Sequence, residues 1–398
     1  MVKKKYELLA PAGGFPQLVA AVNAGADAVY FGLKEFSMRV NAKNFAIKDL
    51  KKINEICGDR VKKYLTINII VYDEEIKKLE TVIKKVKGKV DAIICWDMSV
   101  INLCKKHGIP FHISTQASIS NSQMAQFYTD LGAERLVLAR ELNLKQIKKI
   151  SKINEIECFC HGAMCVAVSG RCFMSQHVSG RSANRGMCTQ PCRRTYEIKD
   201  SEGNKLELDN HTVMSAKDLC AFPFIEKLKA AGITSFKIEG RSRDPRYVDT
   251  VVRQYRKALD KKLTKKEIEE GLVELKKVYT KGISSGFYLG VPTADDFSSV
   301  ENSIATTKKE FLGKITHYYT KAGVGTMLIS NGPVKTGDEI CVIGKTTGIE
   351  SFKIGRLEIE KQEVPEGKRG EEVGFKIPLA RKGDDVYLIH RVNPEEQK

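Results

Sequence analysis

The sequence predicts a TIM-like (β/α)8 barrel followed by a small β-barrel domain, and three observations lead to this fold class. Over the first 160 residues, short apolar runs alternate with stretches whose apolar residues recur at steps of three and four. An eighth apolar run follows a long interruption, and from residue 311 the chain changes to short strands separated by glycine. Continuous apolar strands alternating with helices indicate parallel βα units. Eight such units favour a closed barrel over the alternative, a doubly wound open sheet.

Eight segments are expected to form the barrel strands. In chain order they are Tyr6–Ala10, Ala28–Gly32, Leu65–Ile70, Ala92–Cys95, Phe111–Ser114, Arg135–Ala139, Ile156–Cys160 and Ser235–Gly240. The stretches 74–87 and 143–152 have the apolar spacing of amphipathic helices. After the last strand, residues 244–279 are expected to be helical, with a cap at or near Thr264.

We divide the chain into a barrel domain at 1–285, a linker at 286–305 and a small β-barrel domain at 306–398. A Cys- and Arg-rich insertion at about 162–214 lies between the seventh and eighth strands, and its second half predicts a hairpin that turns at Glu202–Asn204. In the last domain, strands are expected at 311–319, 325–330, 338–343, 353–359, 372–376 and 385–389.

Composition and charge narrow the possible partners. The chain has 398 residues, of which 66 are basic and 49 acidic, giving a formal net charge of +17. Such an excess indicates either a polyanionic partner, usually RNA or DNA, or a general lysine bias of the organism. The sequence has no run of 18 or more apolar residues, which a membrane span would need, and its N-terminus lacks the pattern of a signal peptide. We therefore expect a cytoplasmic protein.

Eleven cysteines are many for a cytoplasmic chain, and seven of them lie within residues 158–220. Disulfides are disfavoured in that compartment, so clustered cysteines indicate metal or redox chemistry. Six residues separate Cys165 from Cys172, and fifteen separate Cys172 from Cys188. Zinc ligands are usually closer in pairs, and among Cys165, Cys172, Cys188 and Cys192 only the last two are that close. The looser spacing favours an iron–sulfur cluster, whose ligands can be far apart in sequence.

The same segment has an unusual charge. Residues 165–194 contain five arginines and no lysine, aspartate or glutamate. Arginine binds phosphate and carboxylate groups through two parallel hydrogen bonds, which lysine cannot do. The segment could therefore hold a metal centre and also clamp an anionic substrate or an RNA backbone. The alternative is a basic surface loop with idle thiols.

Polar residues follow most of the predicted strands, where the mouth of a barrel would be. They are Asn68, Trp96, Asp97, Ser114, Gln116, Arg140, Glu141, His161, Glu239 and Arg241. This distribution predicts a catalytic mouth, although a loop or helix-cap role is the alternative for any single residue. The motif of zinc metalloproteases, His-Glu-x-x-His, is absent.

Four blocks of the sequence resemble a known family. They are ELLAPAG at 7–13, HGAMCVAVSGRCFMS at 161–175, SAKDLC at 215–220 and FKIEGR at 236–241. These blocks are similar to the signatures of the collagenase-like peptidase family U32, and the resemblance covers nearly the whole chain. Despite the family name, the branches it brings together include oxygen-independent hydroxylases. One forms 5-hydroxyuridine at the wobble position of tRNA, with prephenate implicated as cosubstrate.

Two further branches resemble this chain less closely. One hydroxylates a cytidine in 23S ribosomal RNA, and a pair that serves ubiquinone synthesis carries [4Fe–4S] clusters. The chain length, the single β-domain and the block CTQPCRR at 188–194 are most similar to the tRNA branch. The resemblance to the cluster-bearing members implies four cluster ligands, Cys165, Cys172, Cys188 and Cys220. Cys192 competes with Cys220 for the fourth place.

These considerations assign candidate roles to residues of the mouth and the insertion. The candidate catalytic groups are His161, Glu239 and Lys237. The candidate substrate-binding groups are Arg39, Asn68, Gln116, Arg171 and Arg241. Among them, Arg171, Lys237 and Arg241 are expected to bind an anionic cosubstrate.

The resulting hypothesis is an iron–sulfur-dependent, oxygen-independent tRNA uridine hydroxylase with a [4Fe–4S] cluster and a small carboxylate cosubstrate such as prephenate. tRNA is the expected macromolecular partner, and a second family member could serve as a partner subunit. One alternative is a peptidase that acts on collagen-like or other proteins. Another is a non-catalytic RNA-binding subunit of a hydroxylase.

Overall fold

The computed structural model describes the chain except for residues 1–5, 41, 195, 207–213, 301 and 393–398. Eight parallel strands form its central sheet. They are β1 (Glu7–Pro11), β2 (Ala28–Gly32), β3 (Lys62–Thr66), β4 (Ala92–Cys95), β5 (Phe111–Ile113), β6 (Arg135–Val137), β7 (Glu155–Gly162) and β11 (Ser235–Ile238). Each strand pairs with the next, and β11 pairs with both β7 and β1. The sheet therefore closes, which confirms the predicted barrel and excludes the open sheet.

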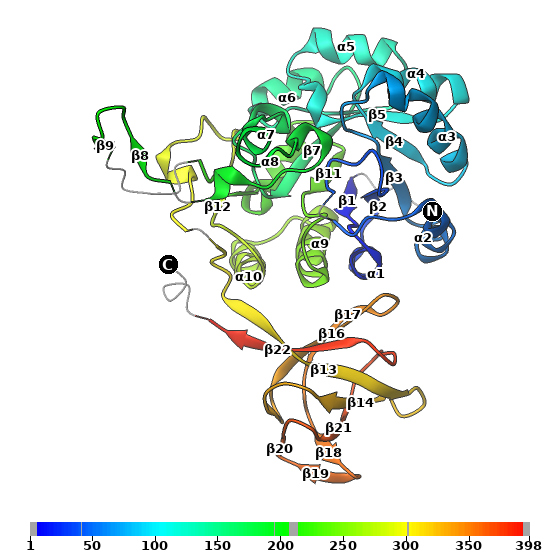
Figure 1. The fold of residues 1–398 in the computed structure, drawn as a ribbon, viewed down its shortest axis with the longest axis vertical. Coiled ribbons are helices and arrows are strands. Elements are labelled where there is room, and N and C mark those ends of the chain that lie inside the picture. The colour runs from blue at the N-terminus through cyan, green and yellow to red at the C-terminus, as the bar shows by residue number, and fades with distance from the viewer. Residues whose placement is uncertain (1–5, 41, 195, 207–213, 301, 393–398) are drawn as a thin grey trace.

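Helices follow the strands and surround the barrel (Figure 1). They are α1 (Phe15–Asn23), α2 (Leu50–Cys57), α3 (Ile76–Val86), α4 (Met98–His107), α5 (Ser122–Asp130), α6 (Leu144–Ile150), α8 (Ile225–Ala230) and α9 (Pro245–Asp260). Short polar side chains cap several of them. Asn121, for example, accepts a hydrogen bond from the backbone N–H of Met124 at 2.9 Å, which satisfies a donor that the first helical turn leaves free.

The predicted helical stretch at 244–279 is two helices. After α9, the backbone at Lys261 becomes extended, and α10 (Lys265–Lys276) begins four residues beyond it. Thr264 caps α10, as expected, and Glu267 completes a capping box with it. The sequence thus located the cap but not the break before it.

One barrel strand lies earlier than predicted. β3 spans Lys62–Thr66, whereas the apolar run predicted Leu65–Ile70. Ile67 and Ile69 are nevertheless buried, because the segment that leaves the strand stays against the barrel core. The apolar residues after β3 are thus explained by packing of this segment against the core and not by strand pairing.

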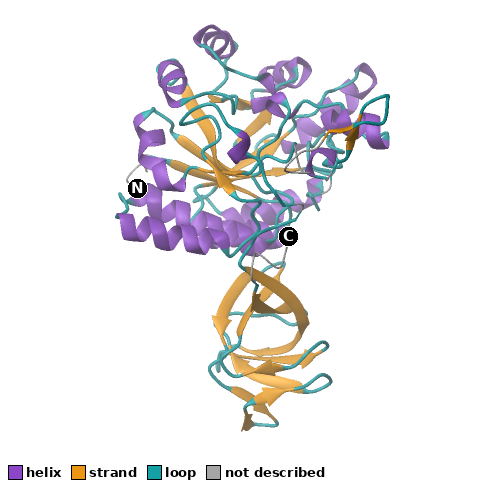
Figure 2. Cartoon of the chain, turned by 90° about the vertical axis from the view of Figure 1, so that its left-hand side faces the viewer, coloured by secondary structure: helices purple, strands orange, loops and turns teal. Residues whose placement is uncertain are grey.

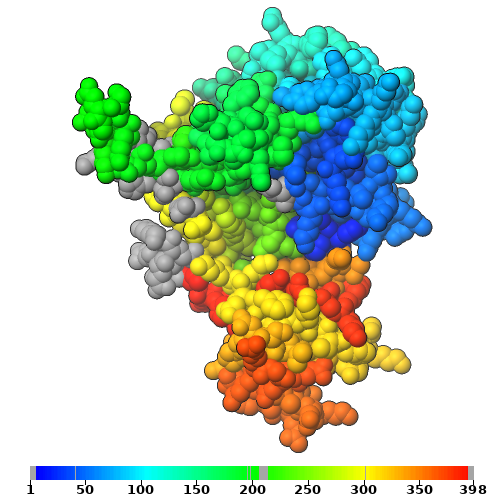
Figure 3. Space-filling model, viewed as in Figure 1, coloured from blue at the N-terminus to red at the C-terminus, as the bar shows by residue number. Residues whose placement is uncertain are grey.

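The insertion leaves β7 at Gly162 and contains the short helix α7 (Met174–Ser179). It also contains the predicted hairpin, formed by β8 (Ile198–Lys199) and β9 (Lys205–Leu206). The hairpin projects from the side of the barrel domain, at the left of the space-filling view (Figure 3). The chain returns through β10 (Asp218–Cys220), which runs antiparallel to the end of β7, and β12 (Ile283–Ser284) pairs beside β10.

The C-terminal part is an antiparallel β-domain that stands below the barrel domain (Figure 2). Its main sheet has the order β17-β16-β22-β13-β14-β21-β18-β19. The strands are β13 (Thr307–Tyr319), β14 (Val324–Ile329), β16 (Glu339–Gly344), β17 (Gly348–Lys353), β18 (Leu357–Ile359), β19 (Gln362–Val364), β21 (Glu372–Lys376) and β22 (Asp385–Arg391). A small second sheet pairs β15 (Val334–Lys335) with β20 (Glu366–Gly367).

The strand predicted at 353–359 is wrong, because this stretch is divided between β17 and β18. The amide of Ile354 donates to the carbonyl of Asp338, at 2.9 Å, which continues the pairing of β17 with β16 by one residue, and the break follows at Gly355 and Arg356. The chain turns there to reach the other end of the sheet, where β18 pairs with β21.

The barrel and the β-domain have separate apolar cores, and a third apolar cluster joins them. In that cluster Ala20 of α1 packs against Cys341 and Ile349 of the β-domain. Gly348 makes the approach possible, because a Cβ added there would lie 2.7 Å from the side chain of Val19. The domain boundaries at 285 and 306 remain predictions.

Candidate functional site at the mouth of the barrel

Glu239, in the loop that follows β11, is the centre of the charged groups at the mouth. Its carboxylate lies 3.3 Å from Nη2 of Arg39, in the loop after β2, and 3.9 Å from Nη2 of Arg140, after β6. Burial alone would raise the pKa of Glu239, but Arg39, Arg140 and further cations outweigh burial and lower it. Three loops from different strands therefore meet at one ionised carboxylate.

Arg241 lies two residues beyond Glu239 and is almost fully buried. Its Nη1 donates hydrogen bonds to the hydroxyls of Thr66, at 2.7 Å, and Ser37, at 2.9 Å. Burial, together with the positive charge of Arg39, lowers the pKa of Arg241 to about 10. The structure thus brings two predicted substrate-binding residues, Arg39 and Arg241, beside Glu239.

Lys237 points into the barrel and does not reach out of it. Its Nζ lies 2.6 Å from Oε1 of Glu157 and 4.5 Å from the centre of the Tyr30 ring. Burial lowers the pKa of Lys237, and Glu157 opposes that effect. Because Lys237 interacts electrostatically with Glu239 and Arg241, it supports the floor of the mouth.

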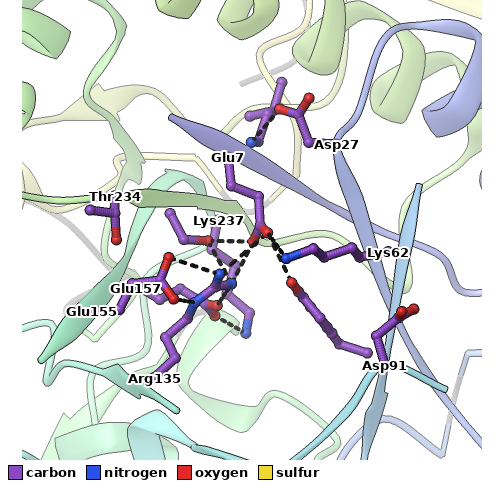
Figure 4. Close-up of polar contacts among 12 residues, drawn as sticks. Glu7, Asp27, Lys62, Asp91, Arg135, Glu155, Glu157, Thr234 and Lys237 are labelled. Carbon is purple, nitrogen blue, oxygen red and sulfur yellow. Dashed lines mark hydrogen bonds and ion pairs between the residues drawn. The ribbon is translucent and has the colours of Figure 1, made fainter. Parts of the chain in front are cut away.

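Below Lys237, charged side chains fill the interior (Figure 4). Arg135, which is 3% exposed at its side chain, contacts the carboxylates of Glu7, Glu155 and Glu157. This network was not predicted from the sequence. The sequence pattern could have indicated it, because otherwise apolar strands are interrupted by the charged residues Glu7, Arg135, Glu157 and Lys237.

Asn68 and Gln116 form a buried polar contact beside the mouth. The amide Nδ2 of Asn68 donates to Oε1 of Gln116 at 3.5 Å, and the same oxygen accepts from the hydroxyl of Ser114. Oδ1 of Asn68 accepts from the backbone N–H of Met38 at 3.4 Å, which fixes the loop that carries Arg39. The two predicted residues therefore meet, as the barrel geometry required.

His161 ends up in different surroundings from those predicted. Its Nδ1 lies 3.3 Å from the hydroxyl of Tyr255, and its ring packs near Tyr247, so both aromatic neighbours come from α9. Burial lowers the pKa of His161 to about 3. The pairing of β7 with β11 is irregular just here, between Lys237 and Ile238. With this lowered pKa, His161 is neutral at neutral pH. Its place at the end of a strand did not predict that the ring turns towards α9.

The insertion docks on the mouth through residues 184–186. The carbonyl of Gly186 accepts from the amide of Val40, at 3.1 Å. Gly186 has φ +85, and a Cβ there would lie 2.3 Å from the carbonyl oxygen of Ser37. Arg185 makes two hydrogen bonds to Glu75, at 2.8 and 2.6 Å. These contacts place the cysteine segment against the loop that carries Arg39.

Cys192 interacts electrostatically with three other cysteines of the insertion. The pKa of Cys192 is raised by burial and by the neighbouring thiols of Cys165, Cys188 and Cys172, while Arg193 lowers it. Ser175 of α7 donates to Sγ of Cys188 at 3.7 Å. The structure thus gathers Cys192 with three of the predicted ligands.

Cys220, the favoured fourth ligand, has different neighbours. It is 3% exposed in β10, where it pairs with His161, and Sγ lies 3.9 Å from the hydroxyl of Tyr255. Burial raises its pKa to about 11. The buried thiol of Cys160 is its electrostatic neighbour. The three other candidate thiols thus act electrostatically on Cys192, and none of them is among the groups that shift the pKa of Cys220.

The thiols of the insertion are the kind of donor that holds an iron–sulfur cluster. Within the described residues, no three His, Cys, Asp or Glu side chains are arranged to hold one metal ion. Arg39 interacts with the thiols of Cys188 and Cys165, and such a nearby cation stabilises thiolates. The soft donors and this cation fit an iron–sulfur cluster.

Arg171 lies at the outer edge of the site. Its Nη2 donates to the hydroxyl of Ser118 at 3.0 Å, and its guanidinium lies 5.9 Å from the centre of the Trp96 ring. Arg171 is exposed, unlike Arg241, so the two predicted anion-binding arginines occupy different depths.

Comparisons with known proteins agree on the family. The model for peptidase family U32 matches residues 13–298. A collagenase of Porphyromonas gingivalis is 38% identical over 413 residues, covering 98% of this chain and 99% of that protein. The tRNA hydroxylation protein P1 of Bacillus subtilis is 37% identical over 367 residues, covering 88% of this chain and 86% of that protein.

Two further similarities cover less. The 23S rRNA 5-hydroxycytidine synthase of Escherichia coli is 40% identical over 260 residues, which are 64% of this chain and 39% of that protein. The solved structure of a U32 peptidase covers 60% of this chain and 95% of its own, with 10% identity and a TM-score of 0.42. Within the part of the chain that the structure describes, no helix is both long and apolar enough to cross a membrane.

Proposed function

Because this chain belongs to peptidase family U32, we propose that it is an RNA-modifying hydroxylase that forms 5-hydroxyuridine at the wobble position of tRNA. The observation that carries the proposal is the similarity to tRNA hydroxylation protein P1 along most of both chains. The relative that is named an rRNA 5-hydroxycytidine synthase also acts on RNA and hydroxylates a pyrimidine base, as the proposed activity does. The net charge of +17 suits a polyanionic substrate.

A [4Fe–4S] cluster in the insertion is part of the proposal. Cys165, Cys172 and Cys188 would provide three ligands, and Cys192 the fourth, with Cys220 as the alternative. When bound, the cluster would supply electron-transfer chemistry next to the mouth. Iron and sulfide are measured in anaerobically purified protein. Cys192→Ser should lose cluster and Cys220→Ser retain it; the opposite result would return the fourth place to Cys220.

The mouth suits a small carboxylate cosubstrate, for which prephenate is the candidate. Arg39, Arg140 and Arg241 surround a single carboxylate, that of Glu239, so their positive charge exceeds its negative charge. A bound carboxylate would neutralise the excess positive charge through bidentate hydrogen bonds with arginine. Glu239 would keep the arginines apart and aligned before it binds. Binding of prephenate, followed by calorimetry, should be lost in Arg241→Met.

The activity test uses a strain that lacks the gene. Mass spectrometry of its tRNA should show no 5-hydroxyuridine at the wobble position, and the wild-type gene should restore it. Unchanged tRNA in the deletion strain, together with metal-free protein, would contradict the proposal.

Peptidase activity is the second candidate, because a relative of nearly the same length is named a collagenase. The surroundings of His161 oppose it. A cysteine peptidase needs a thiolate beside its histidine, but burial raises the pKa of the neighbouring Cys220 to about 11. Hydrolysis of denatured collagen that is lost in His161→Ala would support this second candidate.

A non-catalytic RNA-binding subunit is the third candidate. It differs from the first in one respect, that a second family member would perform the chemistry. Purified protein that hydroxylates tRNA alone excludes this candidate, whereas activity that appears only after adding a second family member supports it.

A further inference from the structure

The part of the insertion around Cys172 exposes apolar side chains that a folded protein normally buries. Phe173 is 78% exposed, Val168 61% and Val166 44%. Phe173 is the most exposed aromatic side chain among the described residues. Exposed apolar groups gathered in one segment and flanked by polar residues mark interaction sites. Packing of this chain on itself therefore does not account for Phe173.

The arginines of the segment separate into two groups by their contacts. Arg185 is held by Glu75, and Arg193 donates to the carbonyl oxygens of Ala216 and Met164, so both fix the insertion to the barrel. The other three, Arg171, Arg181 and Arg194, are exposed and form no ion pair with any described residue. No acidic residue occurs within 165–194 to neutralise them.

The backbone around Phe173 is held in place, so its ring is presented on a fixed support. Ser169, four residues before it, is buried and hydrogen-bonds Ser118 at 2.9 Å. The amide of Cys172 donates to Oδ1 of Asn184 at 3.1 Å, and α7 begins directly after Phe173. A ring on a rigid backbone loses little freedom on binding, which favours contact with a flat partner.

We propose that Phe173 stacks on an unpaired base of the RNA substrate, while Arg171, Arg181 and Arg194 bind the neighbouring phosphates. An exposed aromatic ring in an arginine-rich segment is a combination that binds single-stranded nucleic acid, because the ring stacks on the base and the cations bind the phosphates. Phe173 directly follows Cys172, so the stacked base lies next to the cysteine segment. This inference rests on the proposed function, since it names how that RNA is held.

The test measures RNA binding and not hydroxylation. The probes are total tRNA and a single-stranded uridine-rich oligonucleotide, with a fully paired RNA duplex as the comparison. Loss of one base stack weakens binding by about 5- to 150-fold, so we expect Phe173→Ala to lose at least about fivefold for both probes and little for the duplex. Iron, sulfide and circular dichroism are recorded for every variant.

Two further variants separate stacking from simple apolar contact. Phe173→Leu keeps an apolar side chain but has no ring, so it should bind as weakly as the alanine variant. Phe173→Trp should bind at least as tightly as the wild type. These two also decide the question if the alanine variant fails to fold. The matched control is Phe127→Ala, because Phe127 is 56% exposed on α5, and RNA binding should be unchanged.

Several outcomes would overturn the inference. They are wild-type affinity in Phe173→Leu, equal losses in the Phe127 and Phe173 variants, equal binding of the duplex, or binding of denatured collagen peptides in place of RNA. The proposed function fails separately, if tRNA of the deletion strain is unchanged. Weak RNA binding by Phe173→Leu would then still support the stacking contact.

Discussion

Nη2 of Arg39 lies 3.3 Å from Oε1 of Glu239, and this contact links the loop after β2 to the loop after β11. Glu239 raises the pKa of Arg39, and the thiols of Cys188 and Cys165 add to that effect. Arg39 therefore interacts with the mouth carboxylate and with the cysteine segment at the same time. A substitution at Glu239 should therefore affect both the mouth of the barrel and the cysteine segment.

Replacing Glu239 with glutamine should lower stability and activity together. The variant leaves Arg39, Arg140 and Arg241 without their common counter-charge, at a cost of about 1–3 kcal/mol in the free energy of unfolding. Urea unfolding measures this cost, and the yield of 5-hydroxyuridine should fall at least about tenfold if one such contact acts in the reaction. As control, Glu80→Gln removes ion pairs at the surface of α3 and should destabilise the protein less than Glu239→Gln does, because exposed ion pairs contribute little.

His112 should make the protein less stable in mild acid. It is buried in the barrel, its Nδ1 has no hydrogen-bond partner, and burial lowers its pKa well below the ordinary value near 6.5. Below pH 6.5 the unfolded chain therefore binds one more proton at this residue, so stability falls as the pH falls, by up to about 1.4 kcal/mol per pH unit.

The variant His112→Phe removes this contribution. Its unfolding free energy, measured by urea at pH 7.5 to 4.5, should decline less steeply than that of the wild type. Burial also lowers the pKa of His161, to about 3, so this residue likewise makes stability fall as the pH falls. The variant should therefore keep part of the pH dependence. Parallel curves for the two proteins would contradict the prediction.

Gly186 should be irreplaceable for docking of the insertion. Its φ is +85, and the Cβ of alanine would lie 2.3 Å from the carbonyl of Ser37, so the loop must move. We expect Gly186→Ala to make the insertion sensitive to limited proteolysis and to reduce iron content. Gly180→Ala is the matched control, because Gly180 also has positive φ, +66, but open space around it. It should cost only about 1 kcal/mol.

Arg135 should dominate the stability of the barrel interior. Its loss leaves Glu7 and Glu157 as buried carboxylates without their shared cation, which costs about 3–5 kcal/mol. Arg135→Met should show this loss in thermal and urea unfolding. Arg135→Lys should recover only a part, because one ammonium cannot serve several carboxylates as the guanidinium does. Wild-type stability in Arg135→Met would show that the network is dispensable.

The sequence predicted those features that depend on local pattern. Ala92–Cys95 is a strand with the predicted bounds, and Thr264 caps a helix, because apolar runs and capping residues act on their own neighbours. β3 was misplaced, since Ile67 and Ile69 are buried for a tertiary reason. Closure of the barrel was predictable from the number of strands, whereas the break between β17 and β18 depended on the chain crossing from one end of the sheet to the other.

The candidate site was predictable at the level of loops, but less so at the level of side-chain direction. Arg39, Arg241 and Glu239 meet because strand ends of a barrel converge. His161 also ends a strand, yet its ring turns to α9 where the pairing of β7 and β11 is irregular. The grouping of Cys192 with the other thiols depends on how the insertion folds back, which spacing alone does not determine.

The position of the insertion between β7 and β11 has a consequence for synthesis of the protein. β11 is the strand that closes the barrel onto β1, and it follows the cysteines in the chain. On the ribosome, every cysteine of residues 158–220 emerges before residues 235–238 do. Until then β1 and β7 have open edges, and the cysteine segment is not yet held between neighbouring loops. The proposed cluster could therefore be delivered to these cysteines while the barrel is still open.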